Sequence, residues 1–249
     1  MIPAQVIVIA KEPVPGRVKT RLTPPFSPAQ AAGLAEAALA DTLNAVALAP
    51  VAGRVLALSG ATGPWLPDGF DVVNQSGDGL DQRIGRAFTD AYASHSVPML
   101  LIGMDTPQIT PGLLAQAASA LVSGEADAVL GPAADGGFWL LGLRRPDPAL
   151  TAGIPMSTGH TGQAQLARLV SAGLRVRGLP ELTDVDTVTE AAEVAAALPG
   201  SRFATAFAEA VSGTAVSSTA VSGTAVSGTR PSPAWRTAAF GDFGERVIV

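Results

Sequence analysis

Four cationic side chains fall within eleven residues near the start of the chain, in the stretch Lys11–Arg21 (KEPVPGRVKTR). This stretch holds a quarter of the 16 Lys and Arg residues, and it contains both lysines of the chain, Lys11 and Lys19. Two prolines and Gly16 disfavour a helix and favour a tight loop. The apolar run Val6–Ile9 predicts a buried strand just before the loop, and α/β folds bind phosphates at the carboxyl ends of such strands. The sequence therefore favours a phosphate-binding loop over a solvated surface loop.

A single aspartate follows the most apolar predicted strand of the chain. Pro98–Gly103 is a continuous apolar run, which is typical of a strand buried on both faces, and Asp105 comes directly after it. A carboxylate there could hold Mg²⁺ or Mn²⁺, because Mg²⁺ prefers oxygen ligands and often bridges a protein carboxylate to substrate phosphates. The alternative is that Asp105 caps the helix predicted to begin near Thr110.

Two more aspartates, Asp184 and Asp186, alternate along a segment predicted to be extended. Their side chains should therefore point to the same side. Glu190 stands three residues after Thr187, which is the pattern of a capping box at the start of a helix. The spacing suits metal ligands and helix caps equally well.

Another candidate acid, Asp135, precedes two glycines in the stretch Ala134–Gly137. Glycines allow a ligand to approach the backbone closely, so Asp135 could position an acceptor or act as a base. A plain turn aspartate is the alternative. Near the start of a predicted helix, Asp78 suits the helix dipole, and Arg83 could reach a nucleotide.

The elements that must position these residues alternate along the chain. Strands are predicted at 6–9, 55–58, 70–73, 98–103, 128–131, 138–143 and 174–178, and helices at 28–49, 80–93, 110–122, 162–172 and 187–198. This alternation predicts a mostly parallel sheet with helices on both faces, in a Rossmann-like three-layer α/β/α sandwich. Residues 1–200 would form the nucleotide-binding domain. Residues 201–249, with Ser–Gly–Thr–Ala–Val repeats at 212–231, would form a low-complexity, flexible tail that could dock back through its last residues.

Composition narrows the choice of partners and location. The formal net charge is −5 and no basic face is evident beyond the first loop, so nucleic acid is not expected as a partner. The chain has no cysteine and two histidines, which excludes thiolate chemistry and disfavours a histidine-rich zinc site. No secretory signal and no membrane-spanning segment are expected, so the predicted location is cytoplasmic.

Five blocks together resemble a known family. They are KEPVPGRVKTRL at 11–22, GDGLDQR at 77–83, GMDTP at 103–107, GPAADGGFWLLGL at 131–143 and DVDT at 184–187. Their order and spacing resemble the bacterial DUF2064, or "transferase 1", group of proteins with a glycosyltransferase-A fold. The resemblance covers about residues 4 to 198. More remotely, the layout of the chain is similar to that of the guanylyltransferases that act on molybdenum cofactor and phospholactate, and to that of the cytidylyltransferases of isoprenoid synthesis.

This resemblance implies the nucleotide-diphospho-sugar transferase fold, a divalent metal, a nucleotide sugar or nucleoside triphosphate, and a small-molecule acceptor that it does not identify. Carried over by position, the phosphate- and nucleotide-binding residues would be Lys11, Arg17, Lys19, Arg21, Asp78 and Arg83, the metal ligands Asp105 and Asp186, and the catalytic residues Lys19 and Asp135. Asp135 would face the acceptor.

Three functions remain open at this point. A glycosyltransferase would release a nucleoside diphosphate, whereas a nucleotidyltransferase would release pyrophosphate, and a basic loop would stabilise either leaving group. The chain has Asp105–Thr106–Pro107 where many sugar transferases have Asp–x–Asp, so the motif does not separate the two. The third function is a nucleotide-binding module without turnover, which would need fewer acids than this sequence places near the loop.

Overall fold

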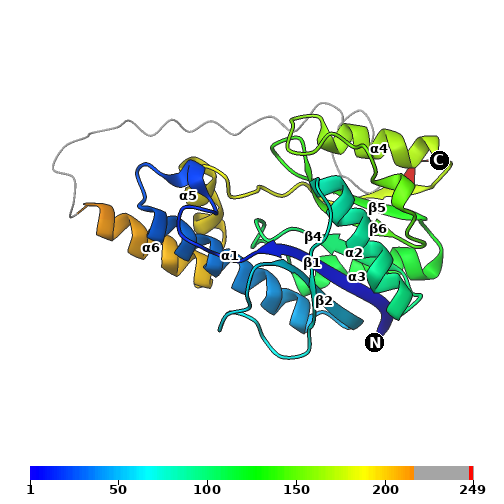
Figure 1. Ribbon diagram of the computed structural model, residues 1–249, viewed down its shortest axis with the longest axis horizontal. Coiled ribbons are helices and arrows are strands. Elements are labelled where there is room, and N and C mark those ends of the chain that lie inside the picture. Colours follow the sequence, from blue (N-terminus) through cyan, green and yellow to red (C-terminus); the bar gives the residue numbers. More distant parts are fainter. Residues whose placement is uncertain (216–246, 249) are drawn as a thin grey trace.

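A computed structural model describes residues 1–215 and 247–248 of the 249-residue chain. Within these residues, eight strands form one sheet in the order β3-β2-β1-β4-β6-β5-β7-β8 (Figure 1). The strands are β1 Ile2–Lys11, β2 Val51–Ser59, β3 Asp71–Asn74, β4 Met99–Ile102, β5 Ala128–Pro132, β6 Phe138–Leu143, β7 Val176–Gly178 and β8 Val247–Ile248. The pairs among β3, β2, β1 and β4 are parallel, whereas β6 runs antiparallel to both β4 and β5. The predicted mostly parallel α/β fold is confirmed.

The helices cover both faces of this sheet. They are α1 Pro28–Leu48, α2 Leu80–Ser94, α3 Pro111–Ser123, α4 Thr161–Ser171, α5 Val188–Ala197 and α6 Arg202–Ala215, with short 3₁₀ turns at Thr20–Leu22 and Pro148–Leu150. On β1, the buried side chains alternate: Val6 and Val8 join a core with α1 and α3, while Ile7 joins a core with α2 and α4. This is why the central strands are apolar throughout, as strands covered on both faces must be.

Local sequence sets the helix starts. The side chain of Ser27 accepts a hydrogen bond from the N–H of Gln30 at the start of α1, and Pro28 follows the cap. Thr110 caps α3 and Thr187 caps α5 in the same way. Each cap satisfies a backbone donor that the first helical turn leaves unpaired. These signals explain why the predicted starts of these helices agree with the structure.

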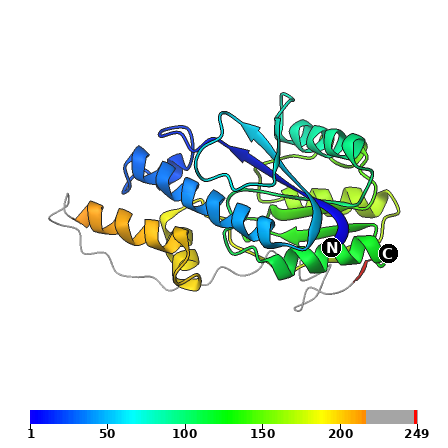
Figure 2. The same cartoon turned by 90° about the horizontal axis from the view of Figure 1, so that it is seen from below.

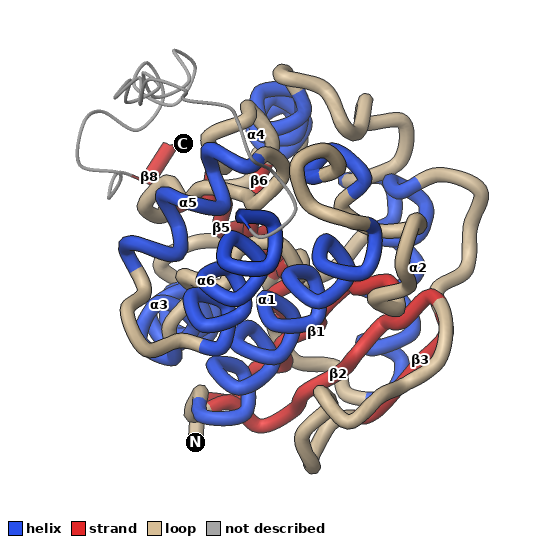
Figure 3. The backbone as a smooth tube through the Cα atoms, turned by 90° about the vertical axis from the view of Figure 1, so that its left-hand side faces the viewer, coloured by secondary structure: helices blue, strands red, loops and turns tan. Residues whose placement is uncertain are grey.

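The end of the folded part lies beyond residue 200. Helix α6 runs alongside α1 (Figures 2 and 3), and its Phe203 is fully buried in a third core with α1 and α5. The carboxylate of Asp41 accepts hydrogen bonds from the backbone N–H groups of Arg202 and Phe203, so α1 also caps α6. The prediction of a flexible tail from residue 201 is therefore corrected for residues 202–215, because the apolar residues there bury one face of a helix.

The rest of the predicted tail lies outside the described residues, except for Val247 and Ile248. These two residues form β8 and pair antiparallel with β7, which agrees with the expectation that the last residues dock back. Among the residues that the structure describes, one helix, α1, is long and apolar enough to cross a membrane by length and composition, and 67% of its most apolar 18 residues are buried inside the protein. The interpretation that no segment passes this test is corrected, since the core helix of a folded domain also passes it.

Candidate active site

A cavity of about 690 Å³ lies at the carboxyl ends of β1 and β4. It is lined by the loop after β1, by the turn after β4, by the β5–β6 turn, by the segment before α5 and by the loop before α4. Ligands of open α/β sheets bind at this end of the strands. The separated blocks of the sequence therefore meet where such folds bind their substrates.

Lys19 joins the acids of this cavity. Its ammonium lies 2.7 Å from Oδ1 of Asp105 and 3.1 Å from Oδ1 of Asp186, and its side chain is 7% exposed. Arg21 adds a second cation, with Nη1 at 3.1 Å from Oδ2 of Asp186, but its side chain is 74% exposed. Lys19 is thus the buried centre of a charge network whose members are separated by up to 167 residues.

The backbone on either side of Lys19 fixes its position. Val18 is buried in the core with α1 and α3, and Leu22 is buried in the core with α5 and α6. Lys19 itself has φ 47° and ψ 37°, a left-handed conformation that few residues other than glycine adopt. The two apolar anchors stabilise this conformation, and the side chain enters the cavity between them.

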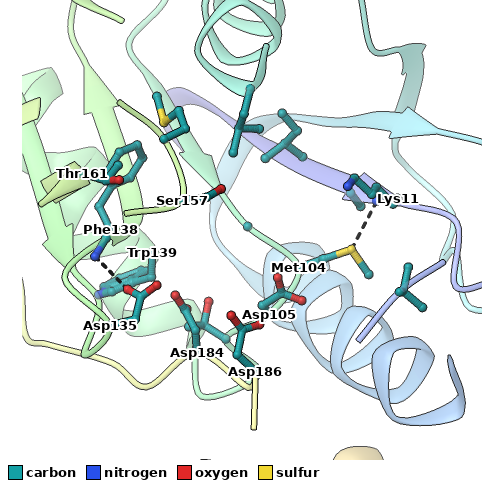
Figure 4. Close-up of a pocket in the computed structure, with 18 of the residues that line it drawn as sticks. Lys11, Met104, Asp105, Asp135, Phe138, Trp139, Ser157, Thr161, Asp184 and Asp186 are labelled. Carbon is teal, nitrogen blue, oxygen red and sulfur yellow. Dashed lines mark hydrogen bonds between the residues drawn. The ribbon is translucent and has the colours of Figure 1, made fainter. Parts of the chain in front are cut away.

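The segment before α5 is hydrogen-bonded to both neighbouring turns, which brings the acids together. The N–H of Val185 donates to the carbonyl of Asp105 at 3.0 Å. Leu182 pairs with the β5–β6 turn through its own carbonyl, which accepts from Ala134 at 2.9 Å. The segment therefore spans the distance between Asp105 and the turn that holds Asp135. Figure 4 shows the result, a row of Asp135, Asp184, Asp186 and Asp105 along one side of the cavity.

Asp105 and Asp186 do not cap helices α3 and α5. Thr110 caps α3, so Asp105 is not the cap of that helix. At α5 the cap is Thr187, and Glu190 accepts hydrogen bonds from the backbone N–H groups of Asp186 and Thr187. The capping-box prediction is confirmed, and it leaves the carboxylate of Asp186 for Lys19 and Arg21.

The turn that holds Asp135 is built around glycine. Gly136 has φ +91°, and a Cβ atom there would lie 2.1 Å from the carbonyl oxygen of Gly159. The Oδ1 atom of Asp135 accepts a hydrogen bond from the N–H of Gly137 at 2.7 Å, which is the turn role expected of an aspartate. Its Oδ2 atom receives no hydrogen bond from the described residues. Asp135 is thus both a turn residue and a lining residue.

The cavity has two ends of different character. We call the residues Lys11, Arg17, Lys19, Arg21, Gln75 and Arg83 the basic end, and the residues Asp135, Phe138, Met156, Ser157, Thr158 and Asp184 the acidic end. In Figure 4, Lys11 lies on one side of the cavity and Phe138, Ser157 and Asp135 lie on the other. Asp105 and Asp186 lie between the two ends, bound to Lys19.

The electrostatics follow from this arrangement. Burial alone would lower the pKa of Lys19, but the carboxylates of Asp105 and Asp186 outweigh it and raise the pKa of Lys19 above its usual value. Burial and the charges of Asp135 and Asp105 raise the pKa of Asp184 well above the usual range for an aspartate. Perturbed groups in a cavity are typical of functional sites.

Nearly all of the residues singled out from the sequence line the cavity. They are Lys11, Arg17, Lys19, Arg21, Arg83, Asp105, Asp135 and Asp186. Asp78 is the exception, because it is exposed and its backbone N–H bonds to Gln82. Asp78 precedes α2 and is not among the lining residues, although Leu80, Arg83 and Ile84 of that helix line the cavity, so the assignment of Asp78 to the nucleotide site stays a prediction.

Several lining residues were not identified from the sequence. Ser157 is one of two residues other than glycine with a positive φ in the described chain, at 59°, and it belongs to the loop that faces Asp135. Gln75 donates from Nε2 to the carbonyls of Ala10 and Ala57, at 2.6 and 2.9 Å, and so joins β1 to β2 beside the cavity. A short polar motif between two elements was the available signal for Ser157. Gln75 offered none.

The donor set is compatible with a divalent metal held by two protein residues. Within residues 1–215 and 247–248, no group of three or more His, Cys, Asp or Glu side chains is arranged to hold a metal ion. Asp105 and Asp186 nevertheless already share one cation, the ammonium of Lys19. Mg²⁺ is commonly held by one or two carboxylates together with substrate phosphates and water. The two carboxylates therefore fit such a metal if a bound substrate supplies the other ligands.

Comparison with solved structures defines the class of fold. The chain is 27% identical to a Desulfovibrio desulfuricans G20 protein provisionally assigned as a nucleotide-diphospho-sugar transferase, with a TM-score of 0.76 over 87% of this chain and 97% of that one. Two other structures resemble it at a TM-score of 0.49. CMP:2-keto-3-deoxy-manno-octonic acid synthetase with CTP is 14% identical (77% and 96% covered), and Mycobacterium tuberculosis H37Rv Rv0371c with manganese is 20% identical (78% and 98% covered).

The chain has the fold of nucleotide-diphospho-sugar transferases. It belongs to the DUF2064 family, described as uncharacterized proteins conserved in bacteria, whose profile matches residues 34–158. The matched range contains Asp105 and Asp135, whereas Lys19 and Asp186 lie outside it. Among curated proteins, no sequence matches the chain significantly.

Proposed function

We propose that this protein is a divalent-metal-dependent glycosyltransferase that uses a nucleotide sugar. One observation carries the proposal: the buried ammonium of Lys19 holds Asp105 and Asp186 together at the boundary between a basic and an acidic half of one cavity. A phosphate-binding loop and a pair of metal-binding acids are the two parts that transfer from a nucleotide requires. The provisional assignment of the similar Desulfovibrio protein supports the same class.

The residues of the basic end would bind the diphosphate. Arg17 and Arg21 can reach it from the exposed side of the loop, and Lys19 contributes a compact, buried charge. Asp105 and Asp186 would hold the metal, which when bound neutralises charge on the leaving phosphate. The basic loop and the two carboxylates are already side by side, so metal binding would require mainly that the ammonium of Lys19 turn from the carboxylates toward a phosphate.

The acidic end would hold the acceptor. During transfer, an acceptor oxygen forms a bond to the anomeric carbon of the sugar, while the bond from that carbon to the diphosphate oxygen breaks. The acceptor hydroxyl passes its proton to the carboxylate of Asp135, and the nucleoside diphosphate leaves with the bonding electrons. Asp135 could both orient the hydroxyl and take its proton, because its Oδ2 atom receives no hydrogen bond from the described residues.

Nucleotidyl transfer is the second candidate, and the charge of the basic end favours it. Four cations from one loop, joined by Arg83, also suit the larger charge of a nucleoside triphosphate. In that case the acceptor would attack the α-phosphorus and pyrophosphate would leave. The two reactions are distinguished by their products.

A thermal-shift screen of nucleotide sugars and nucleoside triphosphates, with and without Mg²⁺ or Mn²⁺, tests the proposal. A ligand that binds the folded state at about 100 times its Kd stabilises it by about 2.7 kcal/mol. We expect a metal-dependent shift with at least one nucleotide sugar, and slow release of nucleoside diphosphate from it. Pyrophosphate release would favour the second candidate. Binding without any turnover, or no binding at all, would contradict both.

A further inference from the structure

Five cations line the cavity, and four of them, Lys11, Arg17, Lys19 and Arg21, come from the loop after β1. The fifth, Arg83, comes from α2 and donates from Nε to the carbonyl of Gly77 at 3.0 Å. The acidic end has the carboxyl groups of Asp135 and Asp184 and no cationic side chain. Lys19, the cation nearest to them, is already shared between Asp105 and Asp186. A negative group placed at the acidic end would therefore be repelled by the carboxylate of Asp135, while the ammonium of Lys19 is already engaged by Asp105 and Asp186.

The other wall of the acidic end is apolar. Phe138 and Met156 are partly buried there and pack against the core that contains α2 and α4. In Figure 4, Phe138 lies at the same end of the cavity as Asp135 and above the row of aspartates. A ligand in this space has hydrocarbon on one side and carboxyl oxygens on the other. Burial of apolar ligand surface against such a wall contributes to binding.

One hydroxyl of this end remains for a ligand. Thr161 donates its hydroxyl to the carbonyl of Pro155 at 2.7 Å and accepts from the N–H of Thr158 at 3.1 Å. The exposed side chain of Ser157 makes no hydrogen bond to the described residues. Ser157 can therefore donate to, or accept from, an uncharged polar group of the ligand.

We propose that the acidic end binds an acceptor that is uncharged or cationic, with a hydroxyl or amino group attached to a hydrocarbon portion, and that it rejects carboxylates and phosphate esters. The inference rests on the proposed function and specifies the acceptor class for that same site. The hydroxyl or amino group would lie against Asp135 and Ser157, and the hydrocarbon portion against Phe138 and Met156.

The expected discrimination is large enough to measure with small probes. Two like charges about 7 Å apart, at an effective dielectric constant of about 20, disfavour binding roughly fiftyfold. Suitable probes share one aromatic ring and differ in charge: 2-phenylethanol, 2-phenylethylamine and phenylacetate. Binding of each to the full chain is measured by ligand-observed NMR at neutral pH and low salt.

We expect the alcohol and the amine to bind at least tenfold more tightly than the carboxylate. The variant Asp135→Asn should narrow that preference about fivefold or more, since it removes one of the charges. Phe138→Ala should weaken all three probes. Asp127→Asn is the matched control, because it also removes one carboxylate, but Asp127 lies before β5 and outside the cavity lining. This variant should prefer the alcohol and the amine over the carboxylate as strongly as the unmodified protein does.

Tighter or equal binding of phenylacetate would overturn the inference. So would an unchanged preference in Asp135→Asn, or the absence of binding by all three probes at millimolar concentration. Nucleotide binding is measured by thermal shift on the same samples. Nucleotide binding without the probe preference contradicts this inference alone, whereas the probe preference without nucleotide binding contradicts the proposed function and supports an uncharged-ligand site at the acidic end.

Discussion

The two ends of the cavity are built by different means. The basic end comes mainly from one irregular loop, whose Lys19 adopts a left-handed conformation between the buried anchors Val18 and Leu22. The acidic end comes from the β5–β6 turn, the loop before α4 and the segment before α5. Backbone hydrogen bonds join these pieces to the β5–β6 turn, from Ala134 to Leu182 and from Gly162 to Gly136. The basic end thus depends on packing of a loop onto helices, whereas the acidic end depends on the sheet.

This difference indicates how each end should respond to change. A loop held by side-chain packing is sensitive to distant substitutions in the core that anchors it. Turns that continue a sheet are protected by its hydrogen bonds and respond mainly to local changes. We therefore expect some substitutions to weaken nucleotide binding at the basic end without changing ligand binding at the acidic end, and others to do the opposite.

The largest effect should come from Phe203→Ala in α6. Phe203 is fully buried in the core that also contains Leu22 and Phe26, which follow the basic loop, and Phe26 contacts Phe207 edge to face. Removing a buried Phe side chain costs about 3–4 kcal/mol of stability. Chemical denaturation should show this loss, and nucleotide affinity should fall while the probe preference of the acidic end is kept in the folded fraction.

Val211→Ala is the matched control on the same helix, since Val211 is 45% exposed and should change stability by less than about 0.5 kcal/mol. Truncation after Gly200 removes all of α6 and should be at least as damaging as Phe203→Ala. A truncation after Gly200 that keeps full stability would show that α6 contributes nothing to the basic end.

Substitution of Lys19 should have the next largest effect. Its ammonium occupies a site that is 7% exposed, between two carboxylates at 2.7 and 3.1 Å. The guanidinium group of arginine is planar and larger than the ammonium group of lysine. Lys19→Arg should therefore impair transfer strongly although it keeps the charge, and Lys19→Ala should be little worse. Loss of a charged hydrogen bond costs about 1.5–3 kcal/mol, or roughly ten- to a hundredfold in nucleotide affinity.

The same pair of variants distinguishes a specific contact from general attraction. Titrations at two salt concentrations would show a strong salt dependence if the loop acts through long-range charge, because salt screens such attraction more than a direct contact. Normal turnover by Lys19→Arg would contradict a specific contact at Lys19.

Asp105→Asn should remove the metal-dependent part of nucleotide binding, about tenfold, and leave the fold intact. Asp186→Asn should weaken the metal less. Because Asp186 also binds Arg21, that variant should in addition loosen the exposed part of the basic loop. Metal titrations at fixed nucleotide concentration measure both effects. An unchanged metal dependence in Asp105→Asn would rule out Asp105 as a metal ligand.

The smallest effect is expected far from the cavity, at Asp127. Its carboxylate accepts hydrogen bonds from Arg175 and also pairs with Arg144, and these contacts hold its pKa below the usual value for an aspartate. A group whose pKa is lowered by folding stabilises the protein above its unfolded pKa of about 3.9, and this contribution is lost as the pH falls through the folded value.

Asp127→Asn should therefore reduce stability at neutral pH by roughly 1 kcal/mol or less, and flatten the stability curve at acidic pH. Thermal denaturation between neutral and acidic pH measures this. A variant that is less stable than the unmodified protein by the same amount at every pH would show that the carboxylate charge is not the cause. Neither end of the cavity should respond.

Much of the fold could be predicted because its signals are local. Capping residues such as Ser27 and Thr187 mark helix starts through contacts with residues three positions further along the chain, and apolar runs mark the strands. The meeting of Lys19 with Asp186 could not be derived from spacing, since 167 residues separate them and the connection depends on how Val185 pairs with Asp105. The family resemblance, rather than periodicity, placed these residues in one site.

Two features of the structure were not predicted from the sequence, for physical reasons. The repeats begin at residue 212, and their composition favoured a flexible segment from residue 201, whereas Phe203, Phe207 and Ala210 have helical spacing and belong to the core of α6. Asp184 was a candidate because it alternates with Asp186, but its raised pKa depends on burial and on Asp135 and Asp105, which come from other turns of the chain. Those neighbours are distant in the sequence, so the raised pKa could not be predicted from the segment itself.

A crystal structure with Mn²⁺ and a nucleotide identified by the screen tests the central claim most directly. We expect anomalous scattering from manganese between the carboxylates of Asp105 and Asp186, with Lys19 turned toward a phosphate. The phosphates should contact the loop 11–21, and the space beside Asp135 and Phe138 should remain for the acceptor. Phosphates bound at the acidic end, or manganese bound away from Asp105 and Asp186, would contradict the account.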